Sequence, residues 1–182
     1  MPKTKRYPLD FYKTSEKLTD TLLSTVDIEG SILEPCAGDG AIAQLLPNCY
    51  TNDIDPDHET DYTIDATSHS AWNLLGEWDW IVTNPPFKDA NLILENAWDY
   101  SKVGIAFLLR LSYLEPTESR RDFLYRTEDH LRFIIPFNPR PKFRLDRKGS
   151  DSVTVAWFIW LKDFSWESRQ LESPIQFISN WR

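Results

Sequence analysis

Short apolar runs alternate with amphipathic segments along the 182 residues of the chain. Runs rich in β-branched and aromatic residues predict seven strands, at residues 31–35, 49–53, 62–64, 79–83, 103–109, 131–137 and 153–161. Segments in which apolar residues recur every three or four positions predict helices, at residues 14–26, 41–46, 68–76, 89–100 and 117–128. Strands that alternate with helices indicate a parallel, doubly wound α/β sheet.

The last two strands depart from this alternation. The link 138–152 between them is rich in Pro, Arg and Gly, so it has no room for a crossover helix. We therefore expect these strands to pair antiparallel. The predicted fold is a seven-stranded, mainly parallel α/β sheet with an antiparallel last strand and helices on both faces. Residues 1–162 form one domain, and residues 163–182 are a tail that packs on it or on a partner.

Composition narrows the class of protein. Hydrophobic residues make up 41% of the chain and aromatic residues 14%, which excludes a disordered or low-complexity protein. No apolar run approaches the ~20 residues that span a bilayer, so we expect no membrane partner. The two cysteines cannot build a disulfide framework, which favours a cytoplasmic location. The net charge of −8 argues against a polyanionic partner, but residues 14–109 are acidic and residues 110–148 are basic.

The first motif is the stretch 33–40, Leu-Glu-Pro-Cys-Ala-Gly-Asp-Gly, which joins a strand to a predicted helix. Gly38 and Gly40 let a ligand approach the backbone closely, and a helix N-terminus offers free N–H donors. The spacing Gly38-x-Gly40-x-x-Ala43 also fits a loose dinucleotide pattern, so a nicotinamide site and a plain tight turn are alternatives.

Two acidic residues are predicted at the ends of strands. Asp53 ends the second strand, where a carboxylate can accept hydrogen bonds from both ribose hydroxyls of an adenosine cofactor. Asp65 ends the third, where it can accept the adenine amino group. We expect Asp55 to be a solvated turn carboxylate.

The motif Asn84-Pro85-Pro86-Phe87 follows the fourth predicted strand. Ligand sites of open α/β sheets lie beyond the carboxyl ends of the strands, so Asn84 is expected in the cleft. The Asn84 side-chain oxygen and the Pro85 carbonyl can grip an amino group, and the ring of Phe87 can stack on a planar base.

In this order, the motifs resemble those of class I S-adenosylmethionine-dependent methyltransferases, and most closely the N6-adenine DNA methyltransferases. The segments 140–143, 149–152 and 156–158 resemble small phage-type members of that group. The resemblance implies S-adenosylmethionine as cofactor and Asn84, Pro85, Pro86 and Phe87 as the catalytic motif that holds the target base. It assigns cofactor contacts to Phe11, Thr14, Glu34, Pro35, Cys36, Ala37, Gly38, Gly40, Asp53, Ile54, Asp65, Ala66 and Asn84. The family segment near Phe11 usually reads Thr-Pro, and here it reads Thr14-Ser15.

Basic residues gather in the loops expected beside Asn84, and they suit the phosphates around a flipped adenine or a single strand of DNA. They are Arg110, Arg120, Arg121, Arg140, Lys142, Arg144, Arg147 and Lys148. We assign substrate binding to Arg110, Arg140, Lys142, Arg144 and Lys148. The three histidines, His58, His69 and His130, lack ligand spacing, so no metal is expected.

Other functions fit parts of this pattern. An RNA methyltransferase acting on an adenine or guanine amine uses the same chemistry. A protein glutamine methyltransferase needs no basic edge, and a non-catalytic subunit would only bind cofactor or nucleic acid. The catalytic domain takes up nearly the whole chain, so we expect a monomer or homodimer whose sequence specificity comes from short loops or a partner subunit.

Overall fold

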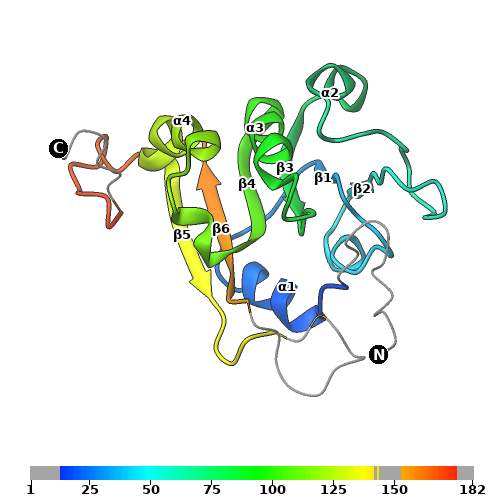
Figure 1. Ribbon diagram of the computed structural model, residues 1–182, viewed down its shortest axis with the longest axis horizontal. Helices are drawn as coiled ribbons and strands as arrows, with labels where there is room; N and C mark the ends of the chain where they lie inside the picture. Colours follow the sequence, from blue (N-terminus) through cyan, green and yellow to red (C-terminus); the bar gives the residue numbers. More distant parts are fainter. Residues whose placement is uncertain (1–12, 142, 144–152, 176–182) are drawn as a thin grey trace.

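The computed structural model describes residues 13–141, 143 and 153–175 (Figure 1). Its strands form one mixed sheet in the order β2-β1-β3-β4-β6-β5. The strands are β1 (Ile32–Glu34), β2 (Cys49–Thr51), β3 (Trp78–Thr83), β4 (Ser101–Arg110), β5 (Leu131–Pro136) and β6 (Val155–Leu161).

Helices cover both faces of this sheet. The α-helices are α1 (Glu16–Leu23), α2 (His69–Leu75), α3 (Ala90–Tyr100) and α4 (Glu118–Thr127), and the 3-10 helices are η1 (Ala43–Leu45), η2 (Leu111–Leu114) and η3 (Glu128–His130). Helices α2, α3 and α4 lie on one face, and α1 and η1 lie on the other (Figure 1). Among the described residues, no helix is both long and apolar enough to cross a membrane.

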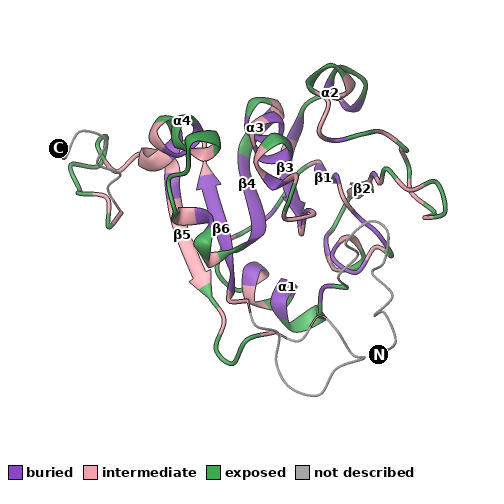
Figure 2. Ribbon diagram, in the orientation of Figure 1, coloured by how far each residue is buried: buried purple, intermediate pink, exposed green. Residues whose placement is uncertain are grey.

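The central strands are buried on both faces because their side chains alternate between two hydrophobic clusters (Figure 2). In β4, Ile105 and Phe107 pack with α3, whereas Ala106 and Leu108 pack in the cluster of α1. Successive residues of a strand point to opposite faces, so an unbroken apolar run is what a sheet covered on both sides requires.

The prediction of an antiparallel end of the sheet is confirmed. Strand β6 lies between β4 and β5 and runs antiparallel to both. Arg110, the last residue of β4, pairs with Val155, the first of β6. The loop between β5 and β6 therefore begins and ends at the edge of the sheet where β4 ends.

The predicted third strand at 62–64 is absent from the described sheet, which has six strands where seven were expected. The segment touches β2 through a single parallel bridge between Asn52 and Tyr62. Side chains hold it in place: the Asn52 amide bonds to the Ile64 backbone, and Asp61 accepts from the Thr51 backbone N–H at 2.8 Å. These contacts take the place of a continuous ladder.

The predicted helix at 41–46 is reduced to the three residues of η1. Gly40 precedes it with a φ of 74°, a left-handed conformation that breaks regular helix geometry. Pro47 follows it and disfavours helical backbone at Leu46, which is extended with a ψ of 136°. Gly40 and Pro47 thus limit the helix to a single turn.

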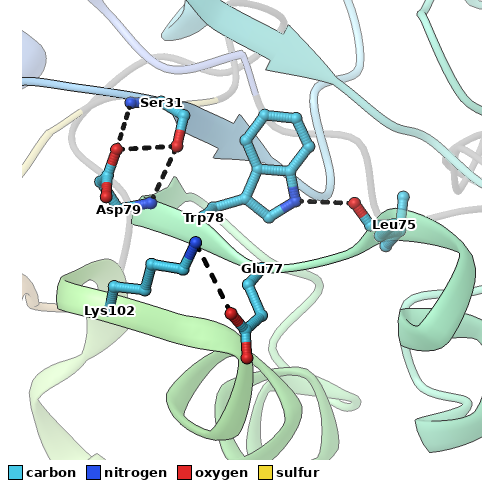
Figure 3. Close-up of polar contacts among 6 residues, drawn as sticks. All are labelled: Ser31, Leu75, Glu77, Trp78, Asp79 and Lys102. Atoms are coloured by element: carbon cyan, nitrogen blue, oxygen red, sulfur yellow. Dashed lines mark hydrogen bonds and ion pairs between the residues drawn. The ribbon is translucent and has the colours of Figure 1, made fainter.

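The amino ends of the parallel strands are fastened by polar contacts far from the predicted site (Figure 3). Asp79 accepts hydrogen bonds from the backbone N–H and the hydroxyl of Ser31, at 2.7 and 2.8 Å. The Ser31 bonds lower the pKa of Asp79. Lys102 forms an ion pair with Glu77 nearby, at 3.5 Å.

The first residues of the tail pack against the start of β5. Trp166 donates its indole N–H to the Leu131 carbonyl at 3.0 Å, and Asp129 accepts hydrogen bonds from Ser165 and from the Glu167 backbone. These bonds fasten residues 165–167 beside the start of β5, while residues 168–174 extend away from the sheet (Figure 1).

Gly104 in β4 is the position where the sheet tolerates no side chain. A Cβ there would lie 2.7 Å from the Trp160 backbone oxygen and 2.9 Å from the Trp80 ring. We expect Gly104→Ala to lower the free energy of unfolding by about 1–3 kcal/mol through overpacking. Urea denaturation measures this, with Val103→Ala at the adjacent exposed position as control. Equal midpoints for the two variants would contradict the prediction.

Candidate cofactor and substrate site

A cavity of about 550 Å³ opens at the carboxyl ends of β1, β2 and β3. Open α/β sheets bind ligands at this edge, and cavities of roughly 300–1,000 Å³ are typical of small-molecule sites. Its wall is built by the turn after β1, the segment after β2, the segment before α2 and the loop between β3 and α3.

The turn after β1 is joined to the segment after β2 by a carboxylate. Asp53 accepts a hydrogen bond from the Gly38 N–H at 2.8 Å through one oxygen and from the Asp55 N–H at 2.9 Å through the other. Gly38 has a φ of 54°, a left-handed conformation that favours glycine. A carboxylate oxygen has two acceptor sites, so Asp53 keeps capacity for a ligand.

The buried Asn52 amide joins the same walls from behind. Its nitrogen donates to the Pro35 and Ile64 carbonyls, each at 2.9 Å, and its oxygen accepts from the Ile64 N–H at 2.9 Å. Asn52 is fully buried. An Asn at the end of a strand carries no signal of its own in the sequence, so this role is apparent only in the structure.

Glu34 is buried at the end of β1, with 2% of its surface exposed. Its carboxyl oxygen accepts the Ala43 N–H at 2.8 Å, so it caps η1. Burial raises the pKa of Glu34 well above its ordinary value, and the nearby Asp39 and Asp53 act in the same direction, whereas the Ala43 bond opposes them. We conclude that Glu34 serves as a structural cap in this wall.

The loop after β3 brings Asn84 to the same cavity. Asn84 donates from its amide nitrogen to the hydroxyl of the buried Thr14, at 3.1 Å, across 70 positions of sequence. Lys13 next to it forms an ion pair with Asp39 at 2.8 Å. The segment before α1 is thus tied to both the glycine turn and the Asn84 loop.

Most residues predicted for the cofactor lie in the wall of this cavity: Thr14, Glu34, Pro35, Cys36, Ala37, Gly38, Asp53, Ile54, Asp65, Ala66 and Asn84. Gly40 does not line it, and Phe11 lies outside the described residues. Of the catalytic motif, Pro86 lines the cavity, whereas Pro85 is buried beside it. The roles of these residues stay predictions.

Several wall residues were not predicted: Lys13, Asp39, Ala41, His58, Ile64, Thr67, Lys88, Asp89 and Ile93. Asp55, expected to be solvated, is half-buried and also lines the cavity. Most of them adjoin predicted residues in the sequence, whereas His58 and Ile93 are brought to the wall by the fold.

The wall is strongly acidic. It contains the carboxyl groups of Glu34, Asp39, Asp53, Asp55, Asp65 and Asp89 but only two lysines, Lys13 and Lys88. A cationic ligand is therefore favoured over an anionic one. Within the described residues, no group of three or more His, Cys, Asp or Glu is arranged to hold a metal ion.

A second cavity of about 210 Å³ lies on the other side of the same loop. Phe87, Lys88, Ala90, Leu109, Arg110, Ser112, Tyr113 and Arg120 line it. The Arg110 guanidinium lies 4.6 Å from the centre of the Phe87 ring. Phe87 therefore faces this second cavity rather than the first.

The predicted substrate residues are only partly described. Arg110 lines the second cavity, and the exposed Arg140 donates to the Thr154 hydroxyl at 3.2 Å near the end of β4. Lys142, Arg144, Arg147 and Lys148 lie outside the described residues. Arg121, expected at the same rim, is exposed, pairs with Asp122 at 3.0 Å and lines neither cavity.

Comparison with known proteins shows the fold. No protein-family model matches the chain, and no curated protein matches it either. A modification subunit of a putative type I restriction enzyme from Vibrio vulnificus matches with a TM-score of 0.62 and 11% identity, over 87% of this chain and 46% of that one. This chain thus spans about half the length of that subunit.

Two further structures cover most of both chains. A precorrin 8w decarboxylase from Methanobacterium thermoautotrophicum has a TM-score of 0.56 and 16% identity, covering 86% of this chain and 95% of that one. Magnesium protoporphyrin IX methyltransferase from Synechocystis, solved with bound S-adenosylmethionine, has a TM-score of 0.53 and 11% identity, covering 80% and 76%. The chain has the Rossmann-like fold of these proteins, and at such identities the likeness concerns the fold alone.

The raised pKa of Glu34 makes stability depend on pH in a specific way. An unfolded Glu ionises near pH 4.3. The contribution of Glu34 to the free energy of unfolding is therefore complete below that pH, and it is lost as the pH rises through the higher pKa of the folded state. Glu34→Gln cannot ionise and keeps an acceptor for Ala43. We expect it to be the more stable protein at pH 9, by about 1 kcal/mol or more.

The measurement is the free energy of unfolding in urea between pH 4 and pH 9. Glu29→Gln, at an exposed position, is the control for removal of one negative charge. Identical pH slopes for wild type and Glu34→Gln would show that the cap ionises as it does in the unfolded chain.

Proposed function

We propose that this protein is an S-adenosylmethionine-dependent methyltransferase that transfers a methyl group to the exocyclic N6 amine of adenine in DNA. The observation that carries this proposal is the placement of Asn84. It stands at the end of β3, in the wall of the acidic cavity, with its amide held by Thr14. Pro85 and Pro86 continue the backbone from it.

The first cavity fits S-adenosylmethionine in size and charge. Its volume of about 550 Å³ and acidic wall suit a ligand that carries a sulfonium and an ammonium group. Asp53 and Asp65 both line the cavity and offer acceptors for the ribose hydroxyls and the adenine amine. When bound, the cofactor supplies an electrophilic methyl group.

A nicotinamide dinucleotide fits this cavity less well. Pyrophosphate binding at such a turn relies on the free N–H groups of a helix N-terminus. Here η1 has three residues, and the Ala43 N–H is already donated to Glu34. The acidic wall would also repel the pyrophosphate charge.

The residues at the end of β3 can activate an amine without a basic side chain. An exocyclic amine is a poor nucleophile because its lone pair is delocalised into the ring. In the proposed reaction the Asn84 side-chain oxygen and the Pro85 carbonyl accept its two hydrogens, which favours tetrahedral geometry at nitrogen. Thr14 positions Asn84 for this. A cofactor held by Asp53 and Asp65 would supply the methyl group to this nitrogen, with the thioether as leaving group, and the methylated nitrogen would release a proton to water.

Nucleic acid as the substrate is supported by cationic and aromatic groups beside the loop. Arg110, Arg120 and Phe87 line the second cavity, and Arg140 lies at the same edge. Cations interleaved with rings suit a polynucleotide with an unstacked base. The Vibrio vulnificus protein is named as a modification subunit of a restriction enzyme, which supports DNA as the substrate. Specificity from a partner subunit stays a prediction.

The test is methyl transfer from labelled S-adenosylmethionine to double-stranded DNA, single-stranded DNA, RNA and a protein extract in parallel. We expect label in N6-methyladenine of DNA, and we expect Asn84→Ala to reduce the rate by at least about 10²-fold because one transition-state acceptor is lost. Cofactor affinity, measured by calorimetry, should fall far less than the rate, because Asn84 is one of many residues in the wall of the first cavity.

Asn73→Ala is the matched control. Asn73 lies on α2, where its oxygen accepts from the Tyr100 hydroxyl, away from both cavities. Label found only in RNA or only in protein would replace the proposed substrate, and no cofactor binding at all would refute the proposed enzyme class.

A further inference from the structure

The two cavities on either side of the Asn84 loop have opposite charge. Six carboxyl groups line the first, whereas none lines the second. The second holds three basic residues, Lys88, Arg110 and Arg120, in a chain whose net charge is −8, and of the three only Lys88 forms an ion pair within the described residues, with Asp89 at 3.4 Å. Such a local excess of positive charge against the overall balance marks a place that favours an anion.

Four elements converge to build this second cavity. Phe87, Lys88 and Ala90 come from the loop after β3 and the start of α3, and Leu109 and Arg110 end β4. Ser112 and Tyr113 belong to η2, and Arg120 belongs to α4. The cations are therefore brought together by the tertiary fold, although 32 positions separate Lys88 from Arg120 in the sequence.

Neutral groups hold both guanidinium groups. Arg110 lies over the Phe87 ring at 4.6 Å. Arg120 donates to the Ser112 carbonyl at 2.9 Å and lies 5.2 Å from the centre of the Tyr113 ring. Within the described residues, neither arginine forms an ion pair with a carboxylate, so their charges are oriented but not neutralised. A fixed fork of donors suits the oxygens of a phosphate.

The position of the cavity determines which anion it suits. Lys88 lines both cavities, and the adjacent Pro86 and Phe87 line the first and the second respectively. An anion in the second cavity thus lies next to an amine held at Asn84. In a polynucleotide, a base and its own backbone phosphates have this relation, whereas a lone nucleoside has no phosphate.

We infer that the second cavity binds a phosphodiester of the strand that carries the target base, through Arg110 and Arg120, with Phe87 and Tyr113 as the aromatic walls. This inference rests on the proposed function, since the target amine is the one placed at Asn84. It makes polynucleotides, rather than free nucleosides or proteins, the substrate of the site.

Binding of a fluorescent single-stranded 12-nucleotide DNA with one adenine, followed by anisotropy at 50–200 mM salt, tests the inference. For Arg110→Ala and Arg120→Ala we expect about 5- to 20-fold weaker binding, and a slope of log K against log salt smaller by about 0.7 per lost contact. Arg120→Lys should restore the slope because it keeps the charge. Affinity for S-adenosylmethionine should stay unchanged.

Arg121→Ala is the matched control. Arg121 follows Arg120 on α4, carries the same charge and lines neither cavity. It should bind the oligonucleotide as the wild type does. If Arg110→Ala and Arg120→Ala keep the wild-type affinity and salt slope, the second cavity does not bind phosphate and the inference is wrong.

Methyl transfer separates this outcome from failure of the proposed function. We expect the two cavity variants to raise the KM for the oligonucleotide while kcat changes little. A wild type that binds the oligonucleotide through both arginines but methylates no nucleic acid refutes the proposed function and leaves the anion site standing. A wild type that methylates DNA with unaltered KM in both variants refutes the anion site alone.

Discussion

The buried amide of Asn52 is the constraint on which the first cavity depends. The backbone of Asn52 donates its N–H to the Glu34 carbonyl and accepts the Ala37 N–H at its own carbonyl. Its side chain bonds to the backbones of Pro35 and Ile64. One residue thus joins the turn after β1 to the segment that carries Asp65. Buried amide groups are costly when unpaired, so these walls keep their separation only while the three side-chain bonds persist. Everything proposed for the cofactor presupposes that spacing.

The loop from Asn84 to Lys88 separates two chemical environments. On one side, carboxylates suit a cationic cofactor, and on the other, guanidinium groups suit an anionic chain. An amine at Asn84 stands between them. A polynucleotide that fits the second cavity would bring its base toward the first, so charge would orient the proposed substrate as well as attract it. The same partition would let a chain of net charge −8 bind the proposed nucleic-acid substrate.

Much of the fold follows from the sequence, because its central strands are long apolar runs buried on both faces. The segments 79–83, 103–109 and 153–161 match β3, β4 and β6 closely. The segment 62–64 has a strand-like composition but is held by side-chain bonds, and periodicity does not report such bonds. The helix at 41–46 was overestimated because the effect of Pro47 on its last turn outweighed the helical spacing.

The candidate site divides in a similar way. Residues within motifs, such as Asp53 and Asn84, were found because a strand end and a glycine turn have local signatures. Arg120 was expected beside Asn84 together with Arg121, whereas Lys88 was not assigned to the site, because only the packing of α4 and η2 beside β4 brings Lys88 and Arg120 together. Arg120 and Arg121 are also indistinguishable in sequence, whereas on a helix they point in different directions.

The tail beyond β6 affects how the molecule meets other copies of itself. Strand β5 is an edge, and an edge offers unpaired backbone groups on which a foreign strand can align and start aggregation. The Trp166 indole N–H donates to the Leu131 carbonyl at the start of that edge. The Arg132 guanidinium lies beside it, over the Phe164 and Trp166 rings. A blocked acceptor and an adjacent charge make β5 a poor template, which protects the sheet from open-ended growth.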